Sequence, residues 1–305
     1  MKKVQILMST YNGENYVREQ IDSLLKQDYQ EVEILIRDDG SKDGTVSILD
    51  EYSRQYQQIT IVKGANKGVI ASFFELVALA DEAAGFYAFC DQDDVWKQEK
   101  VSRAVSLLEK ENPAVPLLYF SRLDLVDENL HFLKKSQIPP AGPGFDNALI
   151  QNIATGCTIV INNAMLQLCK AHMPDEKKVT MHDGWFYLLG TALGKVIYDD
   201  QSFLLYRQHS SNVLGMANSK WKSAKIRYHN FKKMGKNKPY TLQAEEFYRL
   251  FQDDLKKEQK QIVFDFLNKR RSFLQRIGYA LKTPLYRQNN RDTILFKLLY
   301  TLNSY

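Results

Sequence analysis

Three carboxylates fall within four consecutive residues in the run Asp91-Gln92-Asp93-Asp94. Closely packed like charges repel one another, so this arrangement is costly unless a cation lies nearby. Mg²⁺ and Mn²⁺ prefer oxygen ligands, and Mg²⁺ is usually held by one or two carboxylates together with substrate phosphates. The run therefore predicts a divalent metal site that also binds a phosphate-bearing ligand. The alternative is a solvated acidic turn that caps a helix beginning near Trp96.

A second acidic turn has the sequence Asp38-Asp39-Gly40-Ser41. Asp, Gly and Ser commonly form turns and helix caps, which accounts for much of this segment. A doubled aspartate directly after an apolar run is not explained in that way. A carboxylate in this place can accept a hydrogen bond from the N–H of a nucleobase. A third polar turn, Ser9-Thr10-Tyr11-Asn12-Gly13, follows the first apolar run of the chain.

The elements around these turns predict an α/β sheet whose strands are mostly parallel, because short apolar runs alternate with segments of helical periodicity. In such a sheet, ligands bind beyond the carboxyl ends of the strands. The three polar turns follow the first, second and fourth strands, so we expect them to converge on one edge. The predicted strands cover residues 4–8, 32–36, 60–62 and 86–90, and the predicted helices cover 14–28, 45–56 and 70–84.

Taken in order, these motifs resemble those of glycosyltransferase family 2, whose members are inverting enzymes with the GT-A fold. The resemblance covers at least residues 4–215. Each motif alone would be weak, and their ordered combination is specific. The motifs are Met8-Ser9-Thr10-Tyr11-Asn12-Gly13, Asp38-Asp39-Gly40-Ser41, Asn66-Lys67-Gly68 and Asp91-Gln92-Asp93-Asp94-Val95-Trp96.

The resemblance implies roles for the residues of the three turns. Thr10 and Tyr11 would flank the nucleobase, with Tyr11 stacking on it. Asp39 would hydrogen-bond the pyrimidine, with Asp38 beside it. The acidic run 91–94 matches the family's DxD motif, which binds the donor and its metal-bound diphosphate. In that motif Asp91 and Asp93 are the expected Mn²⁺ or Mg²⁺ ligands, and the additional Asp94 leaves open which carboxylate touches the metal.

Two later segments resemble other parts of the family's active site. An inverting transfer needs a carboxylate that takes the acceptor hydroxyl's proton as its oxygen attacks C1 of the sugar. Asp183 matches the family's base, with His182 beside it to orient the base or line the wall; the alternative is that Asp183 caps a helix starting at Trp185. Arg207 and His209 resemble a closing loop, where either can bind the diphosphate and His209 can add a metal ligand, or where both are merely solvated.

Charge divides the chain into an acidic body and a basic tail. From Met216 to Tyr305 there are 20 Lys or Arg and 7 Asp or Glu, a net of +13, which leaves 21 and 29 before them, a net of −8. We expect a catalytic domain at 1–215, with a nucleotide-sugar half at about 1–110 and an acceptor half at 111–215, and a basic helical region at 216–305. Interleaved apolar and basic residues over 276–302 predict a helix lying on a membrane surface, or packed on the body or a partner subunit.

Composition favours a cytoplasmic protein. Cys90, Cys157 and Cys169 lack CxxC spacing and cannot all pair, which favours a reducing compartment and core packing for all three. The N-terminal apolar run is too short for a secretory signal, and the longest uncharged stretch, 147–169, holds too many amides to span a membrane. We therefore expect a location in the cytoplasm or at the inner face of the cell membrane, and the sequence leaves room for a homo-oligomer.

The sequence resembles most closely the rhamnosyltransferases of bacterial surface-polysaccharide and capsule assembly. We expect transfer of L-rhamnose from dTDP-rhamnose to a glycan or lipid-linked acceptor, with a UDP-hexose donor as the alternative. A nucleotidyltransferase would share the α/β layout, but it needs a Gly-rich, basic phosphate loop that residues 9–13 do not supply. A nucleic-acid-binding role for the basic tail is disfavoured, since residues 221–302 contain no recognisable binding module.

Overall fold

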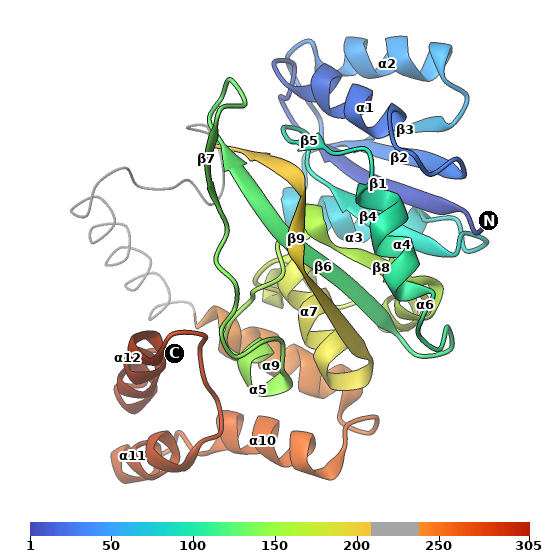
Figure 1. The fold of residues 1–305 in the computed structure, drawn as a ribbon. Coiled ribbons are helices and arrows are strands. Elements are labelled where there is room, and N and C mark those ends of the chain that lie inside the picture. Colours follow the sequence, from blue (N-terminus) through green and yellow to red (C-terminus); the bar gives the residue numbers. More distant parts are fainter. Residues whose placement is uncertain (209–237) are drawn as a thin grey trace. The chain divides into compact units, whose positions relative to one another are not determined.

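The computed structural model describes residues 1–208 and 238–305, which form two compact units. Figure 1 traces the chain through both units. Unit 1 consists of Met1–Ile138, Ala154–Met173 and Gly194–Arg207. Unit 2 consists of Pro139–Ile153, Pro174–Leu193 and the described residues of Gln208–Tyr305.

Unit 1 is built on one sheet, in which the described strands are ordered β3-β2-β1-β4-β8-β6-β9-β5, with β7 paired to β6. The first four strands run parallel, as the alternating pattern predicts. Next to them β8 is antiparallel, and β6 and β9 then form a further parallel pair. The strands are β1 (Val4–Thr10), β2 (Val32–Asp38), β3 (Ile59–Lys63), β4 (Phe86–Cys90), β5 (Val95–Trp96), β6 (Leu117–Val126), β7 (Phe132–Lys135), β8 (Val160–Asn162) and β9 (Lys195–Arg207).

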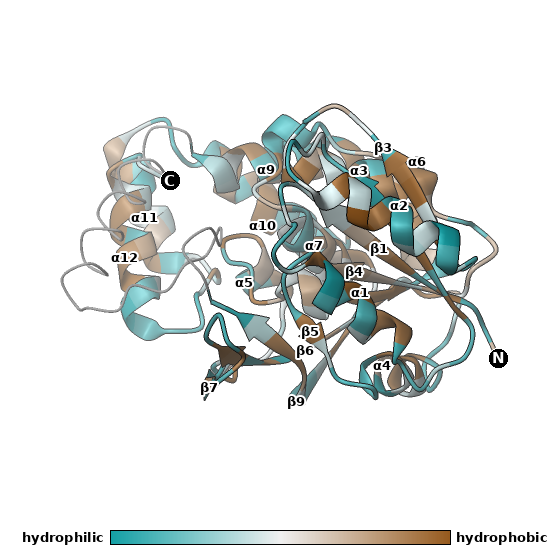
Figure 2. Cartoon of the chain, turned by 90° about the horizontal axis from the view of Figure 1, so that it is seen from above, coloured by the Kyte–Doolittle hydropathy of each residue, from teal (hydrophilic) through white to brown (hydrophobic). Residues whose placement is uncertain are grey.

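Amphipathic helices pack on this sheet through their apolar residues. On α1, Val17, Ile21 and Leu24 recur at helical spacing and are buried in the core, which also holds alternate residues of the inner strands. Figure 2 shows β1 and β4 in hydrophobic colours and banded colours on the helices. The helices of unit 1 are α1 (Val17–Leu25), α2 (Thr45–Gln55), α3 (Val69–Leu79), α4 (Lys100–Leu108) and α6 (Asn163–Ala171), with a 3₁₀ turn at Gly156–Thr158.

The expected start of the helix after the acidic run is wrong. The helix expected to begin near Trp96 begins at Lys100, because Val95 and Trp96 form β5 and pair antiparallel with Leu205 and Leu204 of β9. The acidic run is therefore followed by a strand and does not cap a helix. Trp96 is buried in the core.

Unit 2 has its own aromatic core. Trp185 lies 6.2 Å from Phe247 and 6.3 Å from Phe251, measured between ring centroids. The helix expected to begin at Trp185 begins at His182, so Asp183 lies in its first turn. The helices of unit 2 are α5 (Phe145–Ala148), α7 (His182–Leu193), α9 (Pro239–Phe251), α10 (Lys257–Asn268), α11 (Phe273–Lys282) and α12 (Asn290–Thr301), with a 3₁₀ turn at Glu176–Lys178.

The described residues bear on two further expectations. Cys90, Cys157 and Cys169 are all unpaired and buried, as core packing predicts. Within 1–208 and 238–305, no helix combines the length and the apolarity needed to cross a membrane.

Candidate active site

Strand register places the three polar turns at one edge of the sheet in unit 1. Thr10 is paired with Asp38 across β1 and β2, and Met8 is paired with Cys90 across β1 and β4. The residues that follow these positions therefore leave the sheet side by side. The convergence expected from the sequence is what the backbone shows.

The first and third turns are joined by a pair of amide hydrogen bonds. The backbone N–H of Tyr11 donates to Gln92 Oε1 at 2.8 Å, and Gln92 Nε2 donates to the Tyr11 carbonyl at 3.0 Å. Gly13 leaves room for this close approach, because a Cβ there would lie 2.3 Å from Gln92 Oε1 and the Gln92 side chain would have to shift. The middle residue of the DxD run thus fixes the DxD turn against the Tyr11 turn.

The first and second turns are joined in a similar way. The backbone N–H of Asn12 donates to Ser41 Oγ at 2.9 Å, and Asn12 Oδ1 accepts from the backbone N–H of Lys42 at 2.8 Å. Asn12 takes a φ of 48°, a conformation that asparagine tolerates better than most residues. The three turns form one hydrogen-bonded network.

Asp38 is used to shape its own turn. It is 1% exposed, and it accepts from Thr10 Oγ1 at 3.0 Å, from the Ser41 backbone at 2.9 Å and from Ser41 Oγ at 2.5 Å. Thr10 is equally buried. The structure brings both residues to the predicted edge, and their side chains bond to each other.

Asp39 holds the Asn66-Lys67-Gly68 motif in place. Its Oδ1 accepts from Arg37 Nη1 at 2.6 Å and from the backbone N–H of Lys67 at 2.8 Å, while Oδ2 accepts from the backbone N–H of Gly68 at 2.8 Å. Arg37 is fully buried and also pairs with Glu75 at 3.0 Å. This network explains why the third motif of the ordered series lies near the second.

The acidic run contains one deeply buried carboxylate. Asp94 is 1% exposed, and its Oδ1 accepts from the backbone N–H of Arg207 at 3.1 Å. Burial, followed by the charges of Asp93 and Asp91, raises the pKa of Asp94 well above its ordinary value. Possible ligand atoms of Asp91, Asp94 and Cys157 all lie within 4.8 Å of one another, whereas Asp93 is not among these three.

Cys157 is a poor candidate for a metal ligand or a nucleophile. Burial raises the pKa of its thiol well above the ordinary value, and a hydrogen bond with Asp94 raises it further. The thiolate is the form that binds metals and attacks electrophiles. The structure agrees with the expectation that this cysteine packs in the core.

A buried lysine lies in the same region. The Lys100 ammonium is 3.3 Å from the centroid of the Trp96 ring, and its Nζ has no hydrogen-bond partner among the described residues. Burial lowers its pKa to about 8, against the opposing influence of Cys90, Cys157 and Asp94. Lys100 therefore brings a positive charge toward the buried part of the acidic cluster.

Arg207 is anchored inside unit 1. Its Nε donates to the Asp93 carbonyl at 2.9 Å, its two other nitrogens bond Glu19 on α1 and the carbonyl of Glu128, and its guanidinium lies 4.8 Å from the Tyr16 ring centroid. The residue is 3% exposed. The end of β9 is thereby fixed to the DxD turn, and contact between Arg207 and a diphosphate stays a prediction.

The remaining predicted residues differ in accessibility. Tyr11 is 44% exposed at the edge of the sheet, as a stacking residue needs to be, and Asp91 and Asp93 are half-buried. His209 lies outside the described residues.

Asp183 belongs to unit 2. It is buried at the start of α7, where its Oδ1 accepts from the backbone N–H of Gly184 at 2.6 Å. The neighbouring His182 is also buried, and burial lowers its pKa to about 3, so it is uncharged at neutral pH. Asp183 is the second residue of α7 and bonds the N–H of the next residue, so it is not the N-cap of a helix starting at Trp185, and a role as base stays a prediction.

The positioning residues Gln92, Arg37, Lys100 and Glu19 were not identified from the sequence as parts of the site. Gln92 carried a signal, since it sits inside the DxD run. Arg37 carried one too, because a charged residue in an otherwise apolar strand needs a partner. Lys100 and Glu19 lie on helices with ordinary charge patterns, and nothing in the sequence marks them.

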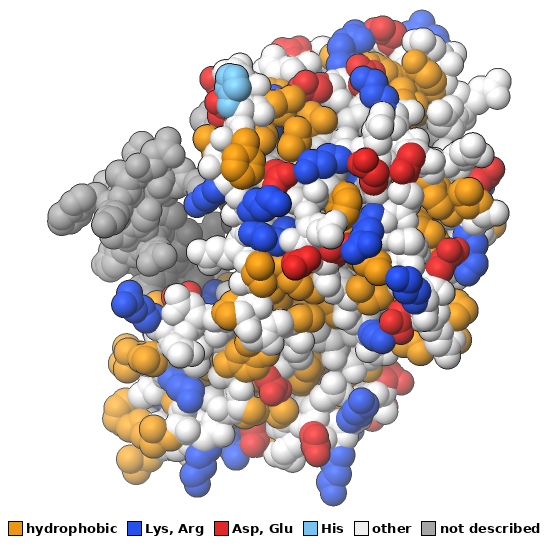
Figure 3. All heavy atoms as spheres, in the orientation of Figure 1, with side chains coloured by type: hydrophobic (Ala, Val, Ile, Leu, Met, Phe, Trp, Pro, Cys, Tyr) orange, Lys and Arg blue, Asp and Glu red, His pale blue; other side chains and the backbone are white. Residues whose placement is uncertain are grey.

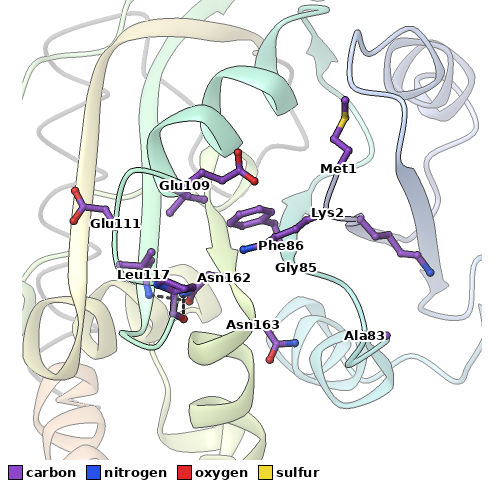
Figure 4. A pocket seen from close by; sticks show the side chains of 13 residues that line it. Met1, Lys2, Ala83, Gly85, Phe86, Glu109, Glu111, Leu117, Asn162 and Asn163 are labelled. Atoms are coloured by element: carbon purple, nitrogen blue, oxygen red, sulfur yellow. Dashed lines mark hydrogen bonds between the residues drawn. The ribbon is translucent and has the colours of Figure 1, made fainter.

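One hollow in the described part of the chain lies elsewhere. It has a volume of about 720 Å³ and includes Lys2, Phe86, Glu109 and Asn162, near the amino ends of β1 and β4 (Figure 4). The polar turns are at the carboxyl ends, so this hollow is not the site that the motifs form.

Residues 5–165 match the family model described as "Glycosyl transferase family 2". The chain belongs to this family. Among curated relatives, it is 28% identical to the dTDP-rhamnosyl transferase RfbG of Shigella flexneri, over 97% of this chain and 99% of that protein. It is also 28% identical to the putative teichuronic acid biosynthesis glycosyltransferase TuaG of Bacillus subtilis, over 73% of this chain and 84% of that protein.

Solved structures confirm the GT-A fold. S. aureus TarS 1-349 in complex with UDP-GlcNAc aligns with a TM-score of 0.61 at 19% identity, over 99% of this chain and 81% of that one. The mannosyltransferase PcManGT from Pyrobaculum calidifontis, in complex with GDP-Man and Mn²⁺, aligns with a TM-score of 0.50 at 16% identity, over 99% and 86%. The family and fold establish a glycosyltransferase, as the ordered motifs predicted.

Proposed function

We propose that this enzyme transfers L-rhamnose from dTDP-rhamnose to a hydroxyl of a glycan or lipid-linked acceptor, with inversion at C1. The observation that carries the proposal is the single network of three polar turns at the sheet edge, in a chain similar over nearly its whole length to a dTDP-rhamnosyl transferase. A surface-polysaccharide acceptor is supported by the relative named for teichuronic acid biosynthesis.

The residues of the acidic run fit a divalent ion. Ligand atoms of Asp91 and Asp94 lie within 4.8 Å of each other, and burial and like charge disfavour the ionised form of Asp94. Bound Mn²⁺ or Mg²⁺ would neutralise the departing diphosphate. Asp94 is 1% exposed and its Oδ1 already accepts from the Arg207 backbone N–H, so we assign the ligand role to the more accessible Asp91 and Asp93, with His209 as a further candidate. Mn²⁺ in the PcManGT complex supports a metal at this kind of fold.

Residues of the chain itself bind the donor, orient it and accept the proton of the acceptor hydroxyl. Tyr11 stacks on the thymine or uracil ring, and Asp39 accepts from the base N–H through the remaining lone pair of Oδ2. Arg207 holds the DxD turn through the Asp93 carbonyl, and thereby fixes the donor side. Asp183 takes the acceptor hydroxyl's proton as the oxygen attacks C1. His182 is uncharged at neutral pH, so it adds no charge beside that carboxylate.

We propose that residues 1–215 form the catalytic part and 216–305 a basic helical appendage. The family match over 5–165 supports the first assignment, and α9 to α12 support the second. Residues 139–153 and 174–193 fold with the C-terminal helices in unit 2, so the appendage shares a core with the acceptor half. We place the enzyme in the cytoplasm, where a lipid-linked acceptor would be reached at the inner face of the membrane.

A donor panel tests the reaction. Purified full-length enzyme is mixed with dTDP-rhamnose, UDP-glucose, UDP-GlcNAc or GDP-mannose, with Mn²⁺ or with EDTA, and hydrolysis or transfer is followed by release of the nucleoside diphosphate. The proposal expects release from dTDP-rhamnose at least about tenfold faster than from the others, a factor equal to ~1.4 kcal/mol of discrimination. Faster release from a UDP-hexose would replace rhamnose by the alternative donor. Release from no donor, with no thermal stabilisation by any, would contradict the proposal.

A further inference from the structure

Helices α11 and α12 expose an unusual number of large apolar side chains. Leu274 and Leu281 of α11 are 79% and 77% exposed, and Ile294 and Leu298 of α12 are each more than half exposed. In both helices these residues recur at helical spacing opposite the buried ones. Figure 3 shows hydrophobic side chains over α11 and α12, with Lys and Arg side chains around them. We call the set of Leu274, Leu281, Ile294, Leu298 and Leu302 the apolar face.

The apolar face is not needed for the helices to fold. The opposite sides of α11 and α12 pack together, with the rings of Tyr279 and Tyr300 4.5 Å apart. Arg276 Nε also donates to the Thr301 carbonyl at 2.8 Å, and Tyr305 Oη donates to the Ile150 carbonyl at 2.8 Å. The two helices are thus held in unit 2 by their inner sides. The outer leucines are presented on a fixed support.

The surroundings of the apolar face are strongly basic. Residues 269–305 contain eight Lys or Arg and a single acidic residue, Asp292. Arg271, Lys282 and Arg291 are exposed. An occupant of this surface must offer apolar groups beside negative charges. A bilayer of anionic lipids has both, in layers a few ångströms apart, and basic helices with one apolar side bind in its surface plane.

We propose that the apolar face of α11 and α12 docks on the surface of an anionic lipid bilayer. The leucines enter the interface between head groups and acyl chains, and the exposed Lys and Arg contact the lipid phosphates. This inference goes beyond the transfer reaction and does not depend on the donor. It assigns the expected membrane contact of 276–302 to named residues and adds Leu274, which lies just before that range.

Vesicle sedimentation of the full-length enzyme tests the proposal. Wild type, Leu274→Ser/Leu298→Ser and a matched control, Leu79→Ser, are mixed with vesicles of phosphatidylcholine alone or with phosphatidylglycerol. Leu79 is an exposed leucine on α3 of unit 1. The expected result is binding of wild type and control to the anionic vesicles, with the double variant at least about tenfold weaker, because it lacks two leucines that would be buried in the bilayer. The double variant keeps every basic residue of the chain, so a loss of vesicle binding is specific to the apolar face.

Other outcomes are equally decisive. Equal binding by the double variant and wild type would overturn the proposal, provided both melt alike. Equal binding of wild type to neutral and anionic vesicles would overturn the role of the basic residues. Sedimentation equilibrium without lipid distinguishes a second copy of the chain: a wild-type dimer that Leu274→Ser/Leu298→Ser dissociates would show that the apolar face joins subunits instead. Weaker binding of Lys282→Glu/Arg291→Glu to the anionic vesicles, at any content of neutral lipid, would support the proposal.

Discussion

The two acidic turns at the edge of the sheet look alike in sequence and differ in structure. Asp38 and Asp39 accept hydrogen bonds from backbone and side-chain donors of the protein, and Asp39 is paired with the buried Arg37. Asp94 has a raised pKa among like charges, and Asp91 and Asp93 are half-buried beside it. The protein's own donors complete the first turn. We propose that a bound divalent cation adds positive charge at the turn 91–94, where the raised pKa of Asp94 is the kind of perturbation common at binding sites.

A carboxylate outside both turns should give the largest loss of activity. Asp183→Asn should lower kcat by about 10²- to 10⁴-fold and leave donor affinity near normal, because a general base acts only in the transition state. Steady-state kinetics and donor titration calorimetry measure the two quantities. Loss of donor affinity with chemistry preserved would move Asp183 to the donor site.

In the turn 91–94, Asp93→Asn should lower kcat/KM by about 10²- to 10³-fold, because one charge that would face the metal and diphosphate is removed. The melting temperature should hardly change, since the carboxylate is half-buried and not part of the core. Mn²⁺ titration of wild type and variant checks the cause. Full wild-type turnover in excess EDTA would contradict a metal role.

In the turn of Asp38 and Asp39, a substitution should mainly lower the stability of the fold. Asp39→Asn should lower the free energy of unfolding by about 3 kcal/mol, because it leaves the buried Arg37 with one partner fewer and places an amide against the Lys67 or Gly68 N–H. Urea denaturation measures this, with Asp253→Asn, an exposed aspartate, as the control. Unchanged stability would mean that the turn is not the framework described.

The link between the Tyr11 turn and the turn 91–94 can be broken from either side. Gly13→Ala should displace Gln92 and raise the donor KM several-fold, because the new Cβ occupies the place of Gln92 Oε1. In a Gln92→Ala background the same change should cost little. The double-mutant cycle should give a coupling energy of about 1 kcal/mol. Additive effects would show that Gly13 acts through its backbone alone.

The sequence predicted the framework well where local patterns determine it. Short apolar runs and their following turns gave the first four strands and the convergent edge, because parallel strands end together. The ordered motifs then gave the family. These features depend on residues near one another in the chain.

Contacts between residues far apart in the chain could not be predicted from the local sequence pattern. Val95 and Trp96 form a strand only because β9, about a hundred residues later, supplies the other half of the ladder. Arg207 bonds Glu19 and the Asp93 carbonyl, and hydrophobic periodicity does not predict contacts between such distant residues. The assignment of 139–153 and 174–193 to the C-terminal unit likewise follows from tertiary packing.

The smallest expected effect is on the pH dependence of stability, and it comes from the buried His182. Burial lowers the pKa of His182 from 6.5 to about 3, so on acidification the unfolded chain gains a proton that the folded chain does not. Stability is therefore full above about pH 6.5 and is lost as the pH falls toward 3, by about 1.4 kcal/mol near pH 5.5 for this one group. His182→Gln cannot take up the proton, so its stability should fall less between about pH 7.5 and 5.5 than that of wild type. Comparing each protein with itself removes any constant cost of the substitution. An identical decline in wild type and His182→Gln would show that His182 exchanges its proton with solvent as readily folded as unfolded, and that the first turn of α7 is open.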